Sequence, residues 1–136
     1  MAITIDELQH FLDTAPFHQF LKMNILEADK ELESIKIQMK YRQEYQRIEG
    51  SGEIHGGVIA SLVDIAGDFA LIHLLGKGVP TINFRVDFLR PAVKTDLIAV
   101  AKVKRAGRNI GVVDIDVFND QGRLVATGTG CYGTGY

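Results

Sequence analysis

Apolar residues follow a helical period over one long central segment of the chain. From Gly56 to about Leu75 they recur three or four positions apart and spread over a wide arc of the helix. A surface helix needs only a narrow apolar stripe, so this pattern predicts a helix that is buried on most sides. At a rise of 1.5 Å per residue, such a helix would be roughly 27–30 Å long.

Alternating apolar and polar residues, which are typical of strands, fill most of the remaining chain. Two strands are expected before the central helix, over residues 21–28 and 32–41. A short helix capped by Thr4 precedes them, and Pro16 ends it or begins a turn. The last three strands are separated by segments of hairpin length and composition, so we expect an antiparallel meander. Strands are expected after the central helix over residues 81–90, 97–104, 110–118 and 124–132.

One long helix and an antiparallel sheet of five or six strands predict an α+β fold in which the sheet curls around the helix. The chain has 136 residues, of which 46% are hydrophobic, so it can bury one sizeable core. It is too short for two ordinary domains, and no linker or repeat interrupts it. We therefore expect a single domain over residues 1–136.

Charge and cysteine content narrow the range of partners and compartments. Fifteen Lys and Arg residues against seventeen Asp and Glu residues leave a formal charge of −2, which gives no general attraction for nucleic acid or acidic lipid. The N-terminal segment lacks the features of a secretory signal, and the apolar runs look shorter than the roughly 20 residues that span a bilayer. A single cysteine, Cys131, cannot form an internal disulfide. We expect a cytoplasmic protein that binds neither nucleic acid nor membranes.

A narrow polar stripe remains on the central helix. Gly57, Ser61, Asp64 and Asp68 follow one another at spacings of four, three and four residues, which places them on one side of the helix. A solvated helix face gives the same pattern. At the start of the helix, unpaired N–H groups beside Gly56 and Gly57 could polarise a developing oxyanion, although paired glycines also serve close packing.

Three stretches of the chain carry a family resemblance. They are IHGGVIASLVDIAGDFA in the central helix, TINFRVDFLRPA in the strand after it, and KRAGRNIGVVDIDVFNDQGRLVATGTGCY near the C-terminus. In order and spacing they resemble the hotdog-fold thioesterases of the phenylacetic-acid-degradation (PaaI-like) group, from about Glu49 onward. The resemblance implies a hotdog fold and hydrolysis of acyl-coenzyme A (acyl-CoA) to a free acid and coenzyme A. It also implies an active site shared between the subunits of a homodimer or homotetramer.

The resemblance further assigns roles around the central helix. It implies that Asp64 is the catalytic carboxylate, acting on water as a general base or directly as a nucleophile. It places His55 and the Gly56 amide at the thioester-binding start of the helix, where the amide polarises the carbonyl. Glu49 and Asp68 stand where relatives commonly carry Asn or Gln and a small hydroxyl residue, respectively. If both converge on Asp64, like-charge repulsion should raise the pKa of at least one carboxyl.

More substrate contacts are implied on the same grounds. Thr81 and Asn83 would line the site from one strand and face the same way, although an ordinary outward strand face has the same pattern. The coenzyme A moiety, which is part of the substrate, would lie along the basic hairpin and near two residues of the preceding strand. A solvated basic turn would look the same. The implied substrate-binding residues are Gly57, Asp68, Thr81, Asn83, Phe88, Arg90, Arg105, Ala106, Gly107, Arg108, Asn109 and Ile110.

Other chemistries find less support in the sequence. His10, His18 and His73 share no metal-ligand spacing with each other or with His55, so we expect no metal site and no cofactor. No Ser-His-Asp or Cys-His arrangement is evident. A non-catalytic acyl-CoA binding protein of the same fold remains an alternative, because two site positions depart from the usual pattern. A hotdog dehydratase is a third possibility, but the chain lacks a matching His and Asp arrangement.

Overall fold

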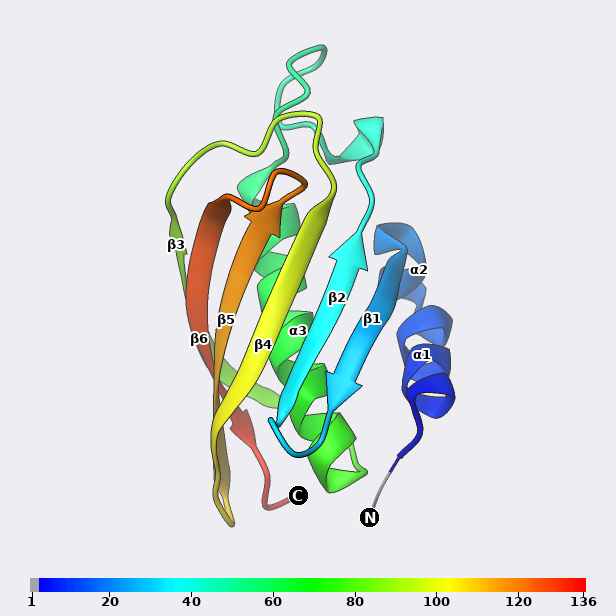
Figure 1. The fold of residues 1–136 in the computed structure, drawn as a ribbon, viewed down its shortest axis with the longest axis vertical. Helices are drawn as coiled ribbons and strands as arrows, with labels where there is room; N and C mark the ends of the chain where they lie inside the picture. The colour runs from blue at the N-terminus through cyan, green and yellow to red at the C-terminus, as the bar shows by residue number, and fades with distance from the viewer. Residues whose placement is uncertain (1–2) are drawn as a thin grey trace.

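The computed structural model describes residues 3–136 and shows a long helix wrapped by one sheet (Figure 1). The helix is α3 (Gly56–Leu75). The sheet has six antiparallel strands in the order β1-β2-β4-β5-β6-β3. The expected α+β fold and the β4-β5-β6 meander are confirmed. The strands are β1 Met23–Asp29, β2 Ser34–Met39, β3 Thr81–Phe88, β4 Leu97–Ala106, β5 Ile110–Asn119 and β6 Leu124–Gly133.

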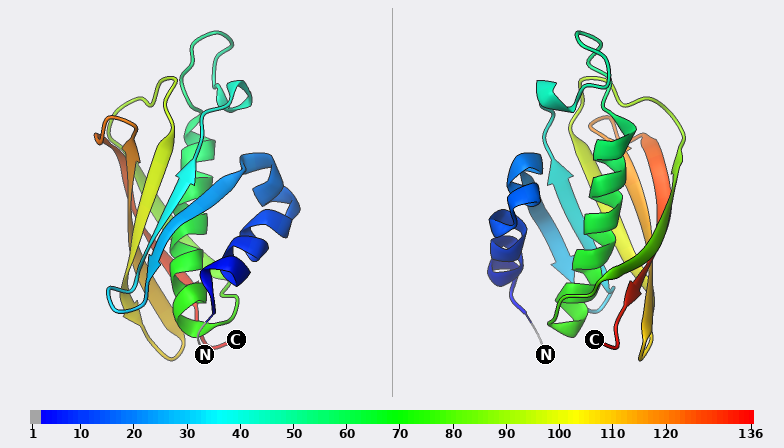
Figure 2. Two further views of the ribbon diagram at one scale, coloured as in Figure 1. Left: turned by 45° about the vertical axis from the view of Figure 1, so that its right-hand side comes forward. Right: turned by 180° about the vertical axis from the view of Figure 1, so that it is seen from behind.

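Helix α3 lies against the concave face of the sheet and supplies the centre of the core (Figure 2). Its Leu62 and Val63 side chains are completely buried, as are Ile37 of β2 and Val117 of β5. Full burial of one such side chain contributes about 1.5–3 kcal/mol relative to leaving it exposed. Helix and sheet therefore stabilise each other, and the helix holds a fixed position for any chemistry on its polar stripe.

Helix α3 has the expected bounds, and its residues are mostly apolar. By length and composition alone, Gly56–Leu75 could cross a membrane. Asp64 and Asp68 interrupt its apolar residues, so it is not an uninterrupted apolar run. Its position inside the sheet accounts for the same composition, because a helix that is packed on most sides needs apolar residues on most sides.

Two short helices pack beside the sheet at the N-terminal end of the chain. Helix α1 (Ile5–Thr14) begins with a capping box, in which Thr4 and Glu7 bond each other's backbone N–H groups. Helix α2 (Pro16–Leu21) stands where the sequence predicts only a turn. Proline suits the first position of a helix because its missing N–H needs no partner there. A short 3-10 helix, η1 (Gln43–Tyr45), lies in the segment expected to be a loop.

The two edges of the sheet differ in how they are covered. At β1, the Gln9 side chain of α1 bonds to the backbone: Nε2 donates to the Met23 carbonyl at 3.1 Å, and Oε1 accepts from the Ile25 amide at 2.7 Å. At the other edge, β3 has no further strand beside it within residues 3–136. Its Ile82 and Phe84 side chains are 50% and 39% exposed. An apolar edge strand of this kind is a site where another strand can pair.

Candidate active site

The start of α3 leaves one backbone donor without a protein partner. His55 caps the helix: its Nδ1 accepts from the Gly57 amide at 2.8 Å, and its carbonyl accepts from the Val58 amide at 3.0 Å. Within residues 3–136, the amide of Gly56 donates to no protein group. A free N–H at the positive end of a 20-residue helix can bind an anionic oxygen.

The structure brings Phe88 and Arg90 to this end of α3. They line a cavity of about 330 Å³ together with Gly56 and Arg47. A Cβ at Gly56 would lie only 3.3 Å from the Phe88 ring, so glycine lets the ring approach the free amide. The cavity falls in the size range of small-molecule sites and combines an aromatic wall with two arginines, of which Arg47 is paired with Glu53 at 2.9 Å.

Asp64 lies in the middle of α3 and is held by two strands. Its Oδ1 accepts a hydrogen bond from the Thr81 hydroxyl of β3 at 2.8 Å. Its backbone carbonyl accepts from the Tyr132 hydroxyl of β6 at 3.0 Å. The second carboxylate oxygen accepts from no protein group within residues 3–136. A carboxylate with one oxygen fixed and the other free can orient and deprotonate a water molecule.

Tyr132 is a residue that the sequence did not lead us to expect near Asp64. Two glycines make room for its ring, since a Cβ at either Gly67 or Gly130 would overlap the Tyr132 hydroxyl. Burial raises the pKa of Tyr132, and the charges of Asp64 and Asp68 raise it further, so the hydroxyl stays protonated and donates. The sequence signal was a glycine inside an apolar helix and the small residues of GTGCY, but only the fold joins these segments.

Asp68, one helical turn beyond Asp64, has a different environment. Its Oδ1 is buried without a hydrogen-bond partner. Burial raises the pKa of Asp68 from 3.8 to about 7, and the negative charge of Asp64 adds to the shift. The Asp68 carboxyl therefore has a raised pKa, as expected for acids that lie close together. The main cause is burial, and repulsion by the Asp64 charge contributes less.

Glu49 does not join these two carboxylates within one protomer. It is exposed, in the loop between η1 and α3 that extends past the start of the helix (Figure 1). There it lines a separate cavity with Gln46 and Lys94. Glu49 therefore does not converge with Asp64 and Asp68 within a single subunit, because this loop projects away from the helix whereas the two aspartates lie deeper along it.

A β-bulge separates Thr81 from Asn83. The two residues pair with consecutive residues of β6, Tyr132 and Cys131, so one residue of β3 is extra. Paired residues share a face of the sheet, and consecutive residues of β6 face opposite sides. Thr81 therefore faces α3, where it bonds Asp64, whereas Asn83 lies on the outer face. The expectation that both face the same way is wrong, because the extra residue shifts the alternation.

The basic hairpin between β4 and β5 lies at the opposite end of α3 from the free amide (Figure 1). It is fixed to the end of β6, where the Thr134 amide donates to the Asn109 carbonyl at 2.9 Å. The same end of β6 bonds to Pro80, immediately before β3. Within one protomer the hairpin is therefore far from Phe88, and the expectation that they adjoin is wrong for a single subunit. The hairpin residues Arg105, Ala106, Gly107, Arg108, Asn109 and Ile110 are exposed or half-buried.

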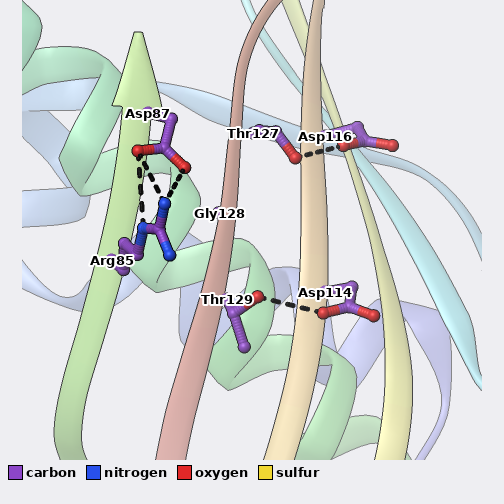
Figure 3. Close-up of a pocket in the computed structure, with 7 residues that line it drawn as sticks. All are labelled: Arg85, Asp87, Asp114, Asp116, Thr127, Gly128 and Thr129. Carbon is purple, nitrogen blue, oxygen red and sulfur yellow. Dashed lines mark hydrogen bonds and ion pairs between the residues drawn. The ribbon is translucent and has the colours of Figure 1, made fainter.

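A second group of acids lies on the outer face of the sheet (Figure 3). Each carboxylate there has a partner: an arginine at 3.1 Å for Asp87, and threonine hydroxyls at 3.1 Å and 2.7 Å for Asp114 and Asp116. In the part of the chain that the structure describes, no three His, Cys, Asp or Glu side chains are grouped so as to hold a metal ion. The hollow, of about 340 Å³, is lined by Arg85, Asp87, Asp114, Asp116, Thr127, Gly128 and Thr129.

The chain is similar to known proteins along most of its length. The family model of the thioesterase superfamily matches residues 51–126, which is more than half of the chain. A protein of Halobacterium salinarum named as an esterase is 35% identical over 116 residues, covering 81% of this chain and 74% of that protein. The acyl-coenzyme A thioesterase PaaI of Escherichia coli is 37% identical over 82 residues, covering 60% of this chain and 58% of that protein.

Solved structures show the same fold. The X-ray structure of a protein from the thioesterase superfamily has a TM-score of 0.89 at 33% identity, covering 95% of this chain and 96% of that one. The PaaI protein of the E. coli phenylacetic acid degradation operon has a TM-score of 0.80 at 25% identity, covering 92% of this chain and 88% of that one. The wrapped helix and the six-stranded sheet are those of hotdog-fold thioesterases. The chain therefore belongs to the thioesterase superfamily and has the hotdog fold.

Proposed function

We propose that the protein hydrolyses acyl-CoA thioesters as a homo-oligomer, with the Gly56 amide polarising the thioester carbonyl and Asp64 activating water. The observation that carries the proposal is the Gly56 amide, which has no protein partner at the start of a long helix. A thioester carbonyl becomes negatively charged when water attacks it, and a free donor in this place stabilises that charge. Acyl-coenzyme A thioesterases among the relatives add support.

The length of α3 favours a site that two subunits share. Asp64 follows Gly56 by eight residues. At 1.5 Å per residue, the two positions lie about 12 Å apart along the helix axis. Helical side chains tilt toward the N-terminus, but an aspartate is too short to close this gap. One thioester carbonyl therefore cannot meet both groups of the same subunit.

The open edge of β3 offers a way to bring the two groups together. Thr81, at one end of the strand, holds Asp64, and Phe88, at the other end, covers Gly56. When the whole strand pairs antiparallel with its copy about a two-fold axis, Thr81 of one copy lies opposite Phe88 of the other. The partner's Asp64 then approaches Gly56 of this subunit. The basic hairpin of the partner subunit approaches Arg90 in the same way.

In such a pair the reaction needs few groups. The partner's Asp64 takes a proton from water, and the water oxygen attacks the carbonyl carbon. The carbonyl oxygen becomes an oxyanion and accepts a hydrogen bond from the Gly56 amide. The carbon–sulfur bond then breaks, the free acid is released, and the coenzyme A thiolate leaves and takes up the proton. In direct attack, the carboxylate oxygen would instead bond to the carbonyl carbon and expel the coenzyme A thiolate, and water would then hydrolyse the resulting anhydride to the free acid and the carboxylate.

The remaining candidate residues have supporting roles in this proposal. His55 fixes the start of α3, because its Nδ1 accepts from the Gly57 amide. The neighbouring Gly56 amide has no protein partner within residues 3–136. The arginines of the hairpin offer bidentate donors to the phosphates of coenzyme A, and the hairpin amides add neutral donors. Glu49 enters the site only if the loop of one subunit meets the helix of the other. Asn83 is not included, because it lies on the outer face.

Release of free thiol from a panel of aliphatic and aromatic acyl-CoA substrates tests the proposal. Asp64→Asn should lower kcat by about 10²–10⁴-fold, because it removes the base. Asp114→Asn, the same change on the outer face, is the matched control and should leave the rates near those of the wild type. Full activity in a folded Asp64→Asn protein would reject the site. Tight binding of acyl-CoA without turnover by the wild type would favour the non-catalytic alternative.

Mixed oligomers test whether the site is shared. Gly56→Pro removes the amide donor, and proline suits the first position of a helix. Neither Gly56→Pro nor Asp64→Asn should be active alone. If the site is shared, refolding the two variants together restores one of the two sites in each mixed dimer. Random pairing makes about half of the dimers mixed, so about a quarter of the wild-type activity should return. No recovery in verified mixed dimers would reject a site that two subunits share.

A further inference from the structure

The open edge strand β3 carries two opposite charges on its outer face. Arg85 pairs with Thr129 of β6, and Asp87 pairs with Thr127, so both side chains lie on the face away from α3. They contact each other, with Nη2 of Arg85 3.1 Å from Oδ2 of Asp87 (Figure 3). The Arg85 side chain is nevertheless 80% exposed, and the Asp87 side chain is 45% exposed. Each charge therefore has room for a second partner.

The inner face of the same strand is apolar. Phe84, Val86 and Phe88 alternate with the two charges along β3, and the Phe88 ring lies beside Gly56 of α3. The Phe84 and Phe88 side chains are 39% and 54% exposed, although burial of such rings is favourable. Within the described residues, no further strand pairs with this edge. Free backbone groups, exposed rings and charges of both signs fit a second copy of the same strand.

A two-fold axis limits how two copies of β3 can pair. The two strands run antiparallel, and residues that lie directly opposite each other share a face of the sheet. Arg85 and Asp87 must therefore lie opposite outer-face residues of the copy. A charged residue meets a charged residue when the axis passes at Arg85, at Val86 or at Asp87.

The charges distinguish these three positions of the axis. An axis at Arg85 sets the two arginines opposite each other, and an axis at Asp87 does the same to the two aspartates. Like charges in directly opposite positions are destabilising. An axis at Val86 sets Arg85 of each copy opposite Asp87 of the other. It also sets Phe84 of each copy opposite Phe88 of the other on the inner face, and aromatic pairs across strands are favourable.

We infer that two copies of β3 pair about a two-fold axis at Val86 and that Arg85 and Asp87 fix this register by binding each other across the axis. The four charges then alternate in sign around the axis. A guanidinium has five N–H donors, so Arg85 keeps the bond to its own Asp87 while it binds that of the copy. The inference rests on the proposed function, from which it takes the pairing of β3 with a second copy.

This register keeps the proposed site shared. It slides the two strands by two residues, or about 7 Å, from an end-to-end pairing that sets Thr81 opposite Phe88. The bulge gives Thr81 the place next to Asn83 in the ladder, so Thr81 now lies beside Arg90 of the copy. Arg90 lines the same cavity as Gly56. The carboxylate that Thr81 holds therefore still meets the other subunit at the start of α3.

Cysteines at the two charged positions test the register. In a Cys131→Ser background, Arg85→Cys and Asp87→Cys are prepared as separate proteins, refolded together and oxidised. Directly opposite residues have Cα atoms about 4.5–5.5 Å apart, which suits a disulfide, whereas diagonal neighbours at about 7–8 Å do not. Disulfide-linked dimers should form in the mixture, in about half of the protein for random pairing, and in neither variant alone.

Every other linkage pattern overturns the inference. Linked dimers of Arg85→Cys alone would place the axis at Arg85, and linked dimers of Asp87→Cys alone would place it at Asp87. No linked dimer in a mixture of two folded variants would mean that β3 does not pair in this register. Lys102→Cys, on the outer face of β4, is the matched control and should link to neither variant.

Exchange of the charges gives a second measurement, by sedimentation equilibrium. Arg85→Asp sets aspartates opposite each other at two places in the dimer, and Asp87→Arg does the same with arginines, so each should raise the Kd of the dimer about tenfold or more. The double variant Arg85→Asp/Asp87→Arg restores opposite charges and should return to about the wild-type Kd. Lys102→Asp is the control and should leave Kd unchanged. An unchanged Kd in both single variants would overturn the inference.

The linkage pattern does not depend on catalysis, so the two proposals can fail separately. Thiol release by the wild type together with linkage in another register overturns the inference and leaves thioester hydrolysis standing. The expected linkage in a protein that releases thiol from no thioester upholds the register, and the proposed hydrolysis fails.

Discussion

Helix α3 and the outer face of the sheet both carry clustered aspartates, but the fold treats the two clusters differently. On the outer face, Asp114 and Asp116 are exposed, and each accepts a hydrogen bond from a threonine hydroxyl. On α3, Asp64 accepts from Thr81, whereas Asp68 has a buried oxygen with no partner. The outer cluster is complete as a protein surface. The inner cluster leaves one carboxyl oxygen without a partner among the described residues.

This difference shows what identifies a site in a small domain. The outer hollow has more carboxylates than the stripe on α3. Its volume is similar to that of a cavity between α1, α2 and α3. Its groups are paired with one another, so nothing there requires a ligand. The helix has fewer polar groups, but they lie beside a free amide, a fixed carboxylate and a carboxyl with a raised pKa. Unsatisfied groups, and not the number of acids, indicate where chemistry takes place.

The largest effect that we expect concerns Asp68 and the dependence of stability on pH. Its pKa is about 7 in the folded state and near 3.8 when unfolded, so the folded state binds more protons between these values. Stability should therefore fall as pH rises through this window. Asp68→Asn removes this titration. From pH 5 to pH 8, the free energy of unfolding of the variant should therefore rise by about 2–3 kcal/mol relative to that of the wild type.

Chemical denaturation at both pH values and at one fixed protein concentration measures this gain. Asp116→Asn controls for a general effect of replacing an acid by an amide on the outer face. A constant difference between Asp68→Asn and the wild type from pH 5 to pH 8 would show that the Asp68 carboxyl is solvated, and the contrast between the two clusters would be lost.

A smaller effect is expected from Gly67, which makes room for the tyrosine beneath Asp64. Gly67→Ala places a methyl group where the Tyr132 hydroxyl lies, so the hydroxyl must move and lose its bond to the Asp64 carbonyl. Overpacking of this kind should lower the free energy of unfolding by about 2 kcal/mol. Gly78→Ala is the control, because a Cβ at Gly78 would meet no atom within 4 Å. Equal stability of the two variants would mean that the tyrosine does not anchor α3.

A matched pair of threonines compares the two clusters directly. Thr81→Val removes the hydroxyl that fixes Asp64, and kcat/KM should fall about tenfold, the equivalent of one hydrogen bond to a charged group. Thr127→Val removes the corresponding hydroxyl from Asp116 on the outer face and should leave kcat/KM unchanged. Steady-state thiol release by the two purified variants provides the comparison. Similar losses in both would indicate an effect on the sheet and not on the site.

The smallest effect is the stability change in Thr127→Val itself. Its hydroxyl lies 2.7 Å from an exposed carboxylate, and cross-strand pairs of this kind contribute about 0.2–1 kcal/mol. Thermal unfolding should therefore shift only slightly. A loss of several kcal/mol would show that the outer cluster is a stabilising network, which the exposed side chains do not suggest.

The sequence predicted the helices and strands better than it predicted the contacts between them. Period and turn chemistry are local properties, so α3 and the six strands were recognisable from the order of residues, as was the stripe that contains Asp64. The proline at the start of α2 was expected to end a helix or begin a turn, and local rules do not separate these uses from a first helical position. Strand alternation placed Thr81 and Asn83 on one face, because a one-residue bulge leaves no mark on the polar pattern.

The contacts that define the site depend on tertiary structure. Tyr132 meets Asp64 across 68 positions of sequence, and no pattern within either segment reports this bond. The His18 side chain looked like an isolated histidine until α2 was placed beside α3. Glu49 was included in the site by resemblance, and its place in the sequence does not fix the direction of its loop, which packing sets.

The Gln9 side chain makes the sheet extendable in one direction only. Because its amide group occupies a carbonyl and an N–H of β1, that edge offers no continuous row of free groups to an incoming strand. Strand addition is left to β3, and two copies that join there use up both open edges at once. In the proposed pair, growth would then stop after a single step, and the apolar edge strand would not be available for polymerisation into fibres.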